Sequence, residues 1–213
     1  MKIYIVRHGE TEYNRQGRLQ GWMDIPLNEK GKMLAVSTAK ALKDVKFDLA
    51  FSSPLERARE TAQIILEYNR HDVPPVRVDD RLKEFNFGEW EGLYCTKDRC
   101  EIPVEFITNF FKNPFACRRP PEGETMDEVC RRTGDFYREL TRNGDNEGKT
   151  VLIAIHGAAM RALLQQVYQD KSDFWHGKVP SNCAVNIVEV HHGESKLIGD
   201  DLIYYPSALA VHP

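Results

Sequence analysis

The sequence has 213 residues, enough for one well-buried globular core or for two small domains. Hydrophobic residues make up 41% of the chain and charged residues 29%, a balance that excludes a disordered, collagen-like or disulfide-scaffold protein. The net charge of −3 gives no general attraction to nucleic acid or to an acidic membrane surface, so any anionic ligand must be held by a local cluster of basic side chains.

The cysteine pattern and the first residues favour a reducing compartment. Five cysteines are an odd number, and none of them has the C-x-x-C spacing of a zinc site. We therefore expect reduced thiols, no metal and no cofactor. The first apolar run is too short for a signal peptide, and no later run approaches the length of a membrane span. The expected location is the cytoplasm, without a membrane or nucleic-acid partner, and no feature of the sequence sets the oligomeric state.

In chain order, the first half of the sequence alternates between strand and helix patterns. Residues 3–6 form a short β-branched run that predicts a buried strand. Apolar residues recur at helical spacing over 28–43, and Asn28 can cap the start of that helix. Residues 47–51 predict a second strand, and a helix with one apolar face follows over 55–66.

The second half continues this alternation. The elements predicted there are a strand at 76–78, a helix at 126–140, a buried strand at 150–155, a helix at 158–168 and two strands near 184–190 and 196–204. The tripeptide His192-Gly193-Glu194 is a hairpin signal between the last two strands. Strands that alternate with helices predict an α/β sandwich with a mostly parallel central sheet.

The segment 93–124 departs from the alternation of strands and helices. It contains four prolines and four phenylalanines: Pro103, Pro114, Pro120, Pro121, Phe106, Phe110, Phe111 and Phe115. We expect residues 1–213 to form a single domain in which 93–124 is an insertion that lies over the sheet edge as a lid. The phenylalanines are expected to pack in the core or in this lid, where they could also line a ligand site.

Two histidines directly follow predicted strands. His8 comes after the strand at 3–6 and His156 after the strand at 150–155, and a glycine follows each histidine. In an open α/β sheet, ligands bind beyond the carboxyl ends of the strands, where helix N-termini present backbone N–H groups. A residue without a Cβ atom lets an anion approach the backbone closely. Two such turns at equivalent points of separate strands indicate a shared crevice.

Two arginines stand at the same ends of the predicted strands. Arg7 precedes His8, and Arg57 lies one turn into the helix that follows the second strand. The planar fork of arginine matches phosphate oxygens in bidentate fashion. Two histidines and two arginines in one small volume would repel one another without an anion. The sequence therefore predicts that a phosphoryl group occupies this crevice.

The chain resembles the histidine phosphatase superfamily, the phosphoglycerate-mutase-like proteins. The matching segments occur in the family's order and span most of the chain: Arg7-His8-Gly9-Glu10-Thr11 with Asn14, Gly17-Arg18-Leu19-Gln20-Gly21-Trp22 with Asp24-Ile25-Pro26-Leu27, Ser53-Pro54-Leu55-Glu56-Arg57-Ala58 with Thr61-Ala62, Arg81-Leu82-Lys83-Glu84, Phe87-Gly88-Glu89-Trp90-Glu91-Gly92, Pro121-Glu122-Gly123-Glu124-Thr125, and His156-Gly157 with Arg161. The resemblance implies a three-layer α/β/α sandwich.

The resemblance also implies roles for particular residues. His8 is expected to be the phosphorylated nucleophile, and Glu84 the proton donor. Arg7, Arg57 and His156 are expected to grip the phosphoryl oxygens. Further substrate or phosphate contacts are expected from Asn14, Gly157, Thr11, Gln20 and Gly21. An imidazole attacks phosphorus only through an unprotonated nitrogen, and neighbouring positive charge favours that state of His8. Fixed cationic donors can stabilise the transferring phosphoryl group in place of a metal.

Three of these residues keep an alternative interpretation. Asn14 could cap the following segment rather than contact phosphate. Arg161 could be a structural ion-pair partner rather than a ligand. Glu84 is chosen over the carboxylates Glu10, Glu89 and Glu91 because of its place in the matched Arg-Leu-x-Glu segment.

The predicted function is hydrolysis of a small phosphorylated metabolite. A mutase would need a second basic subsite and exclusion of water, and mutases of this family tend to carry a larger insertion. Lys97, Arg99, Arg118 and Arg119 could build such a subsite, so phosphoglycerate-mutase-type phosphoryl transfer is the alternative. An inactive sensor of a phosphorylated ligand is a third possibility, although none of the five expected catalytic residues is missing.

Overall fold

The computed structural model describes residues 1–210, so the last three residues of the predicted domain lie outside it. The strands are β1 (Lys2–Arg7), β2 (Leu49–Ser52), β3 (Val76–Val78), β4 (Thr150–Ile155), β5 (Val185–His191) and β6 (Glu194–Leu202). They form one sheet in the order β3-β2-β4-β1-β5-β6. Strands β1 to β4 are parallel to one another, β5 pairs antiparallel with β1, and β6 pairs antiparallel with β5. The predicted α/β fold with a mostly parallel sheet is confirmed.

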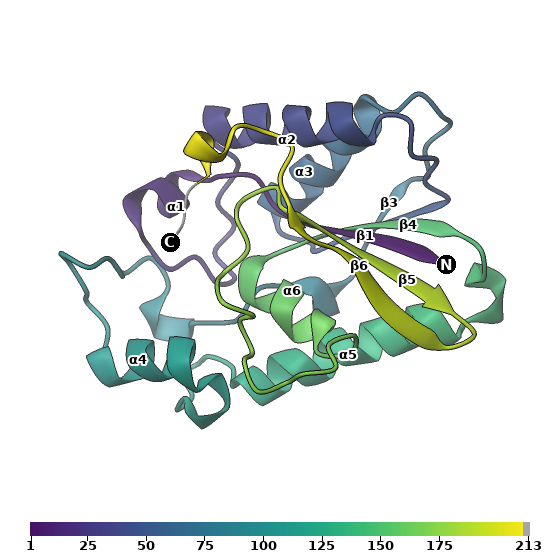
Figure 1. The fold of residues 1–213 in the computed structure, drawn as a ribbon. Helices are drawn as coiled ribbons and strands as arrows, with labels where there is room; N and C mark the ends of the chain where they lie inside the picture. Colours follow the sequence, from purple (N-terminus) through teal and green to yellow (C-terminus); the bar gives the residue numbers. More distant parts are fainter. Residues whose placement is uncertain (211–213) are drawn as a thin grey trace.

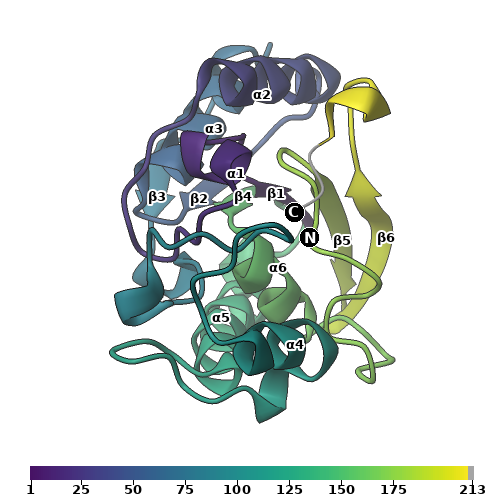
Figure 2. The same ribbon diagram turned by 90° about the vertical axis from the view of Figure 1, so that its left-hand side faces the viewer.

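Helices cover both faces of this sheet. They are α1 (Glu12–Gln16), α2 (Glu29–Leu42), α3 (Glu56–Glu67), α4 (Val104–Lys112), α5 (Met126–Arg142) and α6 (Gly157–Leu164). Short 3₁₀ turns occur at Asp80–Leu82, Gly88–Trp90, Pro114–Ala116, Gly144–Asn146 and Ser207–Leu209. Helices α2 and α3 lie on one face and α5 and α6 on the other, whereas α4 lies beyond the end of the sheet (Figure 1). The view from that end shows the three layers, with the sheet running from β3 to β6 between them (Figure 2).

The central strands are buried on both faces, which explains their continuous apolar sequence. Ile5 of β1 and Ile153 of β4 are paired neighbours, and both belong to the core cluster beneath α5 and α6. Val6 and Ala154 are the next pair, and they face the core cluster beneath α2 and α3. Successive side chains thus pack into opposite layers of the core.

Helix starts follow the capping signals of the sequence. Asn28 caps α2 by accepting a 2.7 Å hydrogen bond from the Gly31 amide, as predicted. Thr125 and Glu128 form a reciprocal capping box at the start of α5. Within residues 1–210, no helix combines the length and the apolar character needed to cross a lipid bilayer.

Three helices differ from the predictions. The helix predicted at 158–168 ends at Leu164, because the amides of Gln166 and Val167 bond three residues back and tighten the chain into turns. Helices α1 and α4 were not predicted at all. Helix α4 lies inside the segment 93–124 and buries Phe106 and Phe110 in the main core.

Candidate active site

The site begins where β1 and β4 end side by side. Arg7 pairs with Ile155 at the last position of the two strands, and the His8 amide donates a 2.9 Å hydrogen bond to the Ile155 carbonyl. His8 and His156, which directly follow these strands, are both buried. Their ring centroids lie 5.1 Å apart. Residues separated by most of the sequence therefore face one another at the carboxyl edge of the sheet.

The hydrogen bond of His8 determines which ring nitrogen can react. Nδ1 lies 2.6 Å from the Gly9 carbonyl, which can only accept, so Nδ1 must carry the hydrogen. The lone pair is then on Nε2. Burial, followed by the charges of Arg57 and Arg7, lowers the pKa of His8 well below its ordinary value. The ring is therefore neutral near pH 7 and has a nucleophilic nitrogen.

His156 is also neutral and is oriented by a serine. Burial lowers its pKa well below the ordinary value, and the Arg57 charge adds to this effect. Its Nε2 lies 2.8 Å from the Ser53 hydroxyl, while its Nδ1 is buried without a hydrogen-bond partner. His156 also forms the N-cap of α6.

The two arginines are held by backbone carbonyls. Arg57 is completely buried in α3 and donates 2.8 Å hydrogen bonds to the carbonyls of Met23 and Gly21. Burial lowers the pKa of Arg57 to about 10, so the guanidinium stays charged at neutral pH. Arg7 donates to the Pro180 carbonyl, and burial lowers its pKa as well.

Several buried donors in this region have no acceptor. They are Nε of Arg7, Nε of Arg57 and Nδ1 of His156. A buried polar group without a partner costs on the order of 1–3 kcal/mol, and more if the group is charged. Within residues 1–210, six buried side-chain nitrogen or oxygen atoms have no hydrogen-bond partner. Half of these six atoms are the three named here, which lie at the ends of β1 and β4 and in α3. An anion bound among them would supply the missing acceptors.

Glu84 lies against the N-terminus of α6. Its carboxylate accepts hydrogen bonds from the amides of Ala158 and Ala159, at 3.2 and 3.0 Å, and from Phe85 at 2.9 Å. An acidic side chain is favoured here because the amides at a helix N-terminus are unpaired and the helix dipole is positive. These bonds orient the carboxylate toward the cavity that it lines.

Two positioning residues were missed by the sequence analysis. Arg132 of α5 forms an ion pair with Glu124 at 2.9 Å and donates a 2.8 Å hydrogen bond to the Glu84 carbonyl. Glu91 accepts from the amides of Trp22 and Met23 at 2.7 and 2.9 Å, and it thereby holds the loop whose carbonyls hold Arg57. Burial raises the pKa of Glu91.

Of the five residues predicted to make further substrate or phosphate contacts, four line the cavity next to His8 and one does not. Asn14, Gln20, Gly21 and Gly157 line the cavity, whereas Thr11 does not. The Thr11 side chain caps α1 with Asn14 and donates a 2.8 Å hydrogen bond to Gln20. Asn14 acts as a cap through Oδ1 and also lies in the cavity wall, where its contact with phosphate stays a prediction. A Cβ atom on Gly157 would stand 3.5 Å from Nε of Arg7 and 3.6 Å from a Glu84 oxygen, inside the site.

Arg161 does not reach the site. It is buried and pairs with Asp201 at 2.6 Å, and it also donates to the Lys178 carbonyl. Arg161 thus connects three parts of the chain: α6, the loop that precedes β5, and β6. It is a structural ion-pair partner, the alternative considered for it in the sequence analysis.

A cavity of about 120 Å³ opens beside His8 and extends to α4, and the fully buried His156 is not among the residues that line it. Its polar wall includes Arg7, His8, Arg57 and Glu84. The apolar part of its wall consists of Leu19, Phe87, Phe110, Phe111, Ala158, Trp175 and Val179. Trp175 holds α4 in place, because its indole N–H donates a 2.8 Å hydrogen bond to the Phe110 carbonyl.

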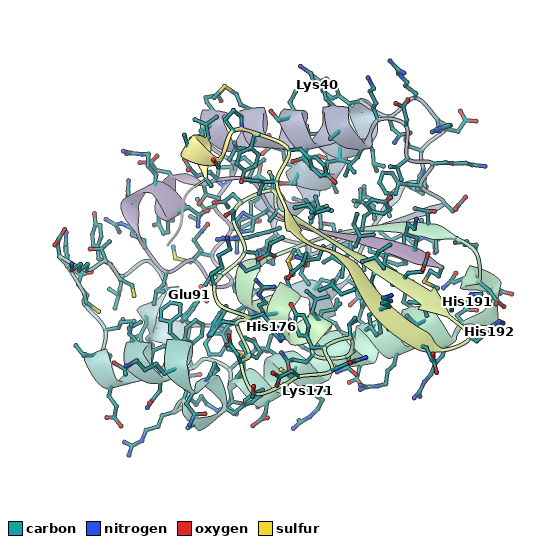
Figure 3. All side chains as sticks on the ribbon, in the orientation of Figure 1. Lys40, Glu91, Lys171, His176, His191 and His192 are labelled. Atoms are coloured by element: carbon teal, nitrogen blue, oxygen red, sulfur yellow. The ribbon has the colours of Figure 1, made fainter. Side chains whose placement is uncertain are left out.

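A larger hollow of about 750 Å³ lies elsewhere, against the β5–β6 hairpin. His191 and His192 line it, and Figure 3 places them at the opposite end of the sheet from Glu91. None of the predicted catalytic residues lines this hollow. Within residues 1–210, no three His, Cys, Asp or Glu side chains are arranged to hold a metal ion.

The family model of the histidine phosphatase superfamily (branch 1) matches residues 3–199. The chain belongs to this superfamily. Its relatives within the superfamily include both phosphatases and mutases. An uncharacterized phosphatase, PhoE, of Bacillus subtilis is 35% identical over 185 residues, 87% of this chain and 86% of the relative. A 2,3-bisphosphoglycerate-dependent phosphoglycerate mutase 2 of Gloeobacter violaceus is 32% identical over 165 residues, 78% of this chain and 74% of the relative.

A solved histidine phosphatase fold agrees with the architecture. The structure of YhfR from Bacillus stearothermophilus superimposes with a TM-score of 0.84 at 30% identity, covering 95% of this chain and 97% of that one. The three-layer arrangement expected from the resemblance is confirmed.

Proposed function

We propose that the protein is a phosphatase that hydrolyses a small phosphate monoester through a phosphohistidine on His8. The observation that carries this proposal is the convergence of a neutral imidazole, with a free Nε2, and buried donors without acceptors. A phosphoryl group satisfies both features, because its phosphorus accepts the nucleophile and its oxygens accept the donors. The first half of the reaction transfers the phosphoryl group to the protein.

In this first step, Nε2 of His8 bonds to phosphorus while the bond from phosphorus to the alcohol oxygen breaks. Glu84, in its protonated form, donates a proton to the departing oxygen. The Nδ1–H of His8 remains bonded to the Gly9 carbonyl, which stabilises the charge that develops on the ring. Arg7 and Arg57 neutralise the phosphoryl oxygens in the transition state.

His156 is proposed to donate to a phosphoryl oxygen through Nδ1. The Ser53 hydroxyl accepts a 3.3 Å hydrogen bond from the Leu55 amide and is placed to donate its own hydrogen to Nε2 of His156. That arrangement leaves the hydrogen of the neutral imidazole on Nδ1, the atom without a partner.

In the second step, water attacks the phosphohistidine. The Glu84 carboxylate accepts a proton from the water, the phosphorus–Nε2 bond breaks, and inorganic phosphate leaves. Glu84 is then protonated again and His8 is neutral, so the protein is ready for another substrate. The positive charge in this scheme comes from arginine side chains, and turnover is expected to persist in EDTA.

The cavity wall supports a hydrolase more than a mutase. Lys97, Arg99, Arg118 and Arg119 are all absent from the lining of the cavity. Arg99 pairs with Glu101 and Arg119 with Glu128. Among residues 1–210, the one further cationic side chain in the lining is Arg18. A second strongly basic subsite, which a bisphosphorylated intermediate would need, is not assembled by these residues.

The apolar wall supports a substrate whose alcohol has an apolar surface. Phe110 and Phe111 come from α4, and Trp175 stands against both of them with ring centroids 5.3 and 5.7 Å away. We propose that the segment 93–124 acts as the lid of a single domain and sets the choice of leaving group. Burial of such a group would contribute roughly 25 cal/mol per Å² of apolar surface.

Three assays on the wild-type protein test the proposed function. With p-nitrophenyl phosphate in EDTA, we expect steady release of phosphate. With 3-phosphoglycerate, we expect phosphate release that does not depend on a bisphosphate primer. Isomerisation that requires the primer would establish the mutase instead, and binding without either reaction would establish a sensor.

Replacing Glu84 by glutamine tests the proton donor. The isosteric amide cannot donate a carboxyl proton, so we expect turnover of an alkyl phosphate to fall by about 10²-fold. Turnover of p-nitrophenyl phosphate should fall by less than about tenfold, because that leaving group hardly needs a proton. Glu89→Gln, on the exposed side of the same segment, is the control and should leave both rates unchanged. Equal slowing of both substrates by Glu84→Gln would contradict the acid role.

A further inference from the structure

Cys95 and Cys100 face each other across a short antiparallel bridge in the segment 93–124. The flanking hydrogen bonds run from the Thr96 amide to the Arg99 carbonyl, at 2.8 Å, and from the Glu101 amide to the Tyr94 carbonyl, at 2.9 Å. This pattern defines a non-hydrogen-bonded pair, in which Cα atoms are typically about 4.5 Å apart. The usual Cα separation across a disulfide is about 4.4–6.8 Å, so the backbone already has a suitable geometry.

The two thiols also satisfy the requirements of contact and access. Both are free, and the residues that carry them are directly paired across the bridge. Cys100 is exposed and Cys95 is half-buried. Burial, and then the neighbouring Cys100 thiol, raises the pKa of Cys95 to about 11. Cys100 is therefore expected to be the thiol that attacks an oxidant first.

We propose that Cys95 and Cys100 are a redox modification site that closes to a reversible disulfide in the folded protein. The oxidant is a small-molecule disulfide such as oxidised glutathione. The Cys100 thiolate attacks one sulfur of the oxidant, forms a mixed disulfide and releases one thiol. The Cys95 thiolate then attacks the Cys100 sulfur, forms the internal bond and releases the second thiol. Two protein thiols are oxidised and one small disulfide is reduced to two thiols, which balances the reaction.

The hairpin that carries this pair is joined directly to the cavity wall. The Cys95 amide donates a 2.8 Å hydrogen bond to the Gly17 carbonyl, and the Leu19 amide donates to the Leu93 carbonyl at 3.0 Å. Arg18, which lines the cavity, places its guanidinium 4.1 Å from the centre of the Tyr94 ring and bonds the Tyr94 hydroxyl. A cross-link beside Tyr94 restricts the motion of the strand that holds Arg18.

Intact-protein mass spectrometry and a tryptic digest test the proposal. After treatment with oxidised glutathione, we expect a loss of about 2 Da, reversed by dithiothreitol, because two hydrogens leave when the bond closes. Trypsin cuts after Lys97 and Arg99, between the two cysteines. Without reductant, peptides 84–97 and 100–112 should therefore migrate as one linked species.

Variants distinguish this bond from random thiol chemistry. Cys95→Ser should leave Cys100 as a mixed disulfide with glutathione, and the loss of about 2 Da should disappear. Cys130→Ser, on α5, is the matched control and should behave as the wild type. A wild-type protein that gains only glutathione adducts, or links any other pair, would overturn the proposal.

A second experiment tests whether the disulfide restrains the strand that carries Arg18, and it does not require enzymatic turnover. Hydrogen–deuterium exchange of the Leu19 and Cys95 amides, which bond across to the carbonyls of Leu93 and Gly17, should slow at least about twofold in the oxidised protein, because these two segments separate less often. Unchanged exchange in fully cross-linked protein would overturn the connection to Arg18. Both results are independent of whether the protein is a phosphatase.

Discussion

Replacing His8 by alanine is expected to lower kcat/KM for any phosphate monoester by at least about 10³-fold, because it removes the proposed nucleophile that takes the phosphoryl group. Alanine leaves the donors of Arg57 and His156 in place. The variant should therefore still bind phosphate while it loses covalent chemistry. The measurement is a rapid quench with radiolabelled substrate, in which the wild type shows acid-labile phosphate on the protein and the variant shows none.

His71→Ala is the control for the His8 experiment. His71 is an exposed histidine after α3, far along the chain from either strand end of the site. Its replacement should change neither the rate nor the phosphoprotein signal. If His8→Ala retained a phosphoprotein with normal turnover, the nucleophile would have to be another residue and the proposed mechanism would be wrong.

Replacing Arg57 by leucine is expected to lower kcat/KM by about 10²–10³-fold, the usual effect of removing one donor from a preorganised oxyanion site. The ligand-free protein should lose on the order of 1–3 kcal/mol of stability, because the carbonyls of Met23 and Gly21 lose their donor. In addition, the rise in Tm that phosphate produces in the wild type should become much smaller, since ligand binding stabilises only through its affinity for the native state.

Two further variants make the Arg57 test specific. Arg59→Leu removes an exposed arginine from the same helix and should leave kcat/KM unchanged. Arg57→Lys keeps the charge but replaces the planar fork, whose separate nitrogens bond the two carbonyls, by a compact ammonium, so it should remain impaired. Activity of Arg57→Leu within about threefold of the wild type would argue against a role in phosphoryl binding.

The sheet and the two strand-end histidines could be predicted because their signals are local. Strands β3 and β4 were predicted with their observed bounds, since short β-branched runs between turns have few other interpretations. A residue that directly follows a parallel strand must lie at its carboxyl end. The positions of His8 and His156 therefore followed from the topology alone.

Other features depend on contacts that a local pattern does not contain. Helix α4 was missed because prolines surround it and its apolar face was interpreted as irregular packing; its stability comes from Phe110 and Trp175. Glu91 and Arg132 hold backbone groups of distant loops. The sequence does show that Glu91 lies in a matched segment and that Arg132 lies in a predicted helix. The backbone groups that these two charged side chains bind can be identified only in the folded chain.

The placement of β1 has a consequence for how the chain is made. This strand begins at residue 2 but lies between β4 and β5, which begin at residues 150 and 185. Because synthesis proceeds from the amino end, Ile3 and Ile5 leave the ribosome long before either flanking strand exists. The nascent chain must therefore carry an unpaired apolar strand through most of translation. Such a strand is a natural ligand for a holding chaperone, and premature termination before β4 would leave a fragment prone to aggregate.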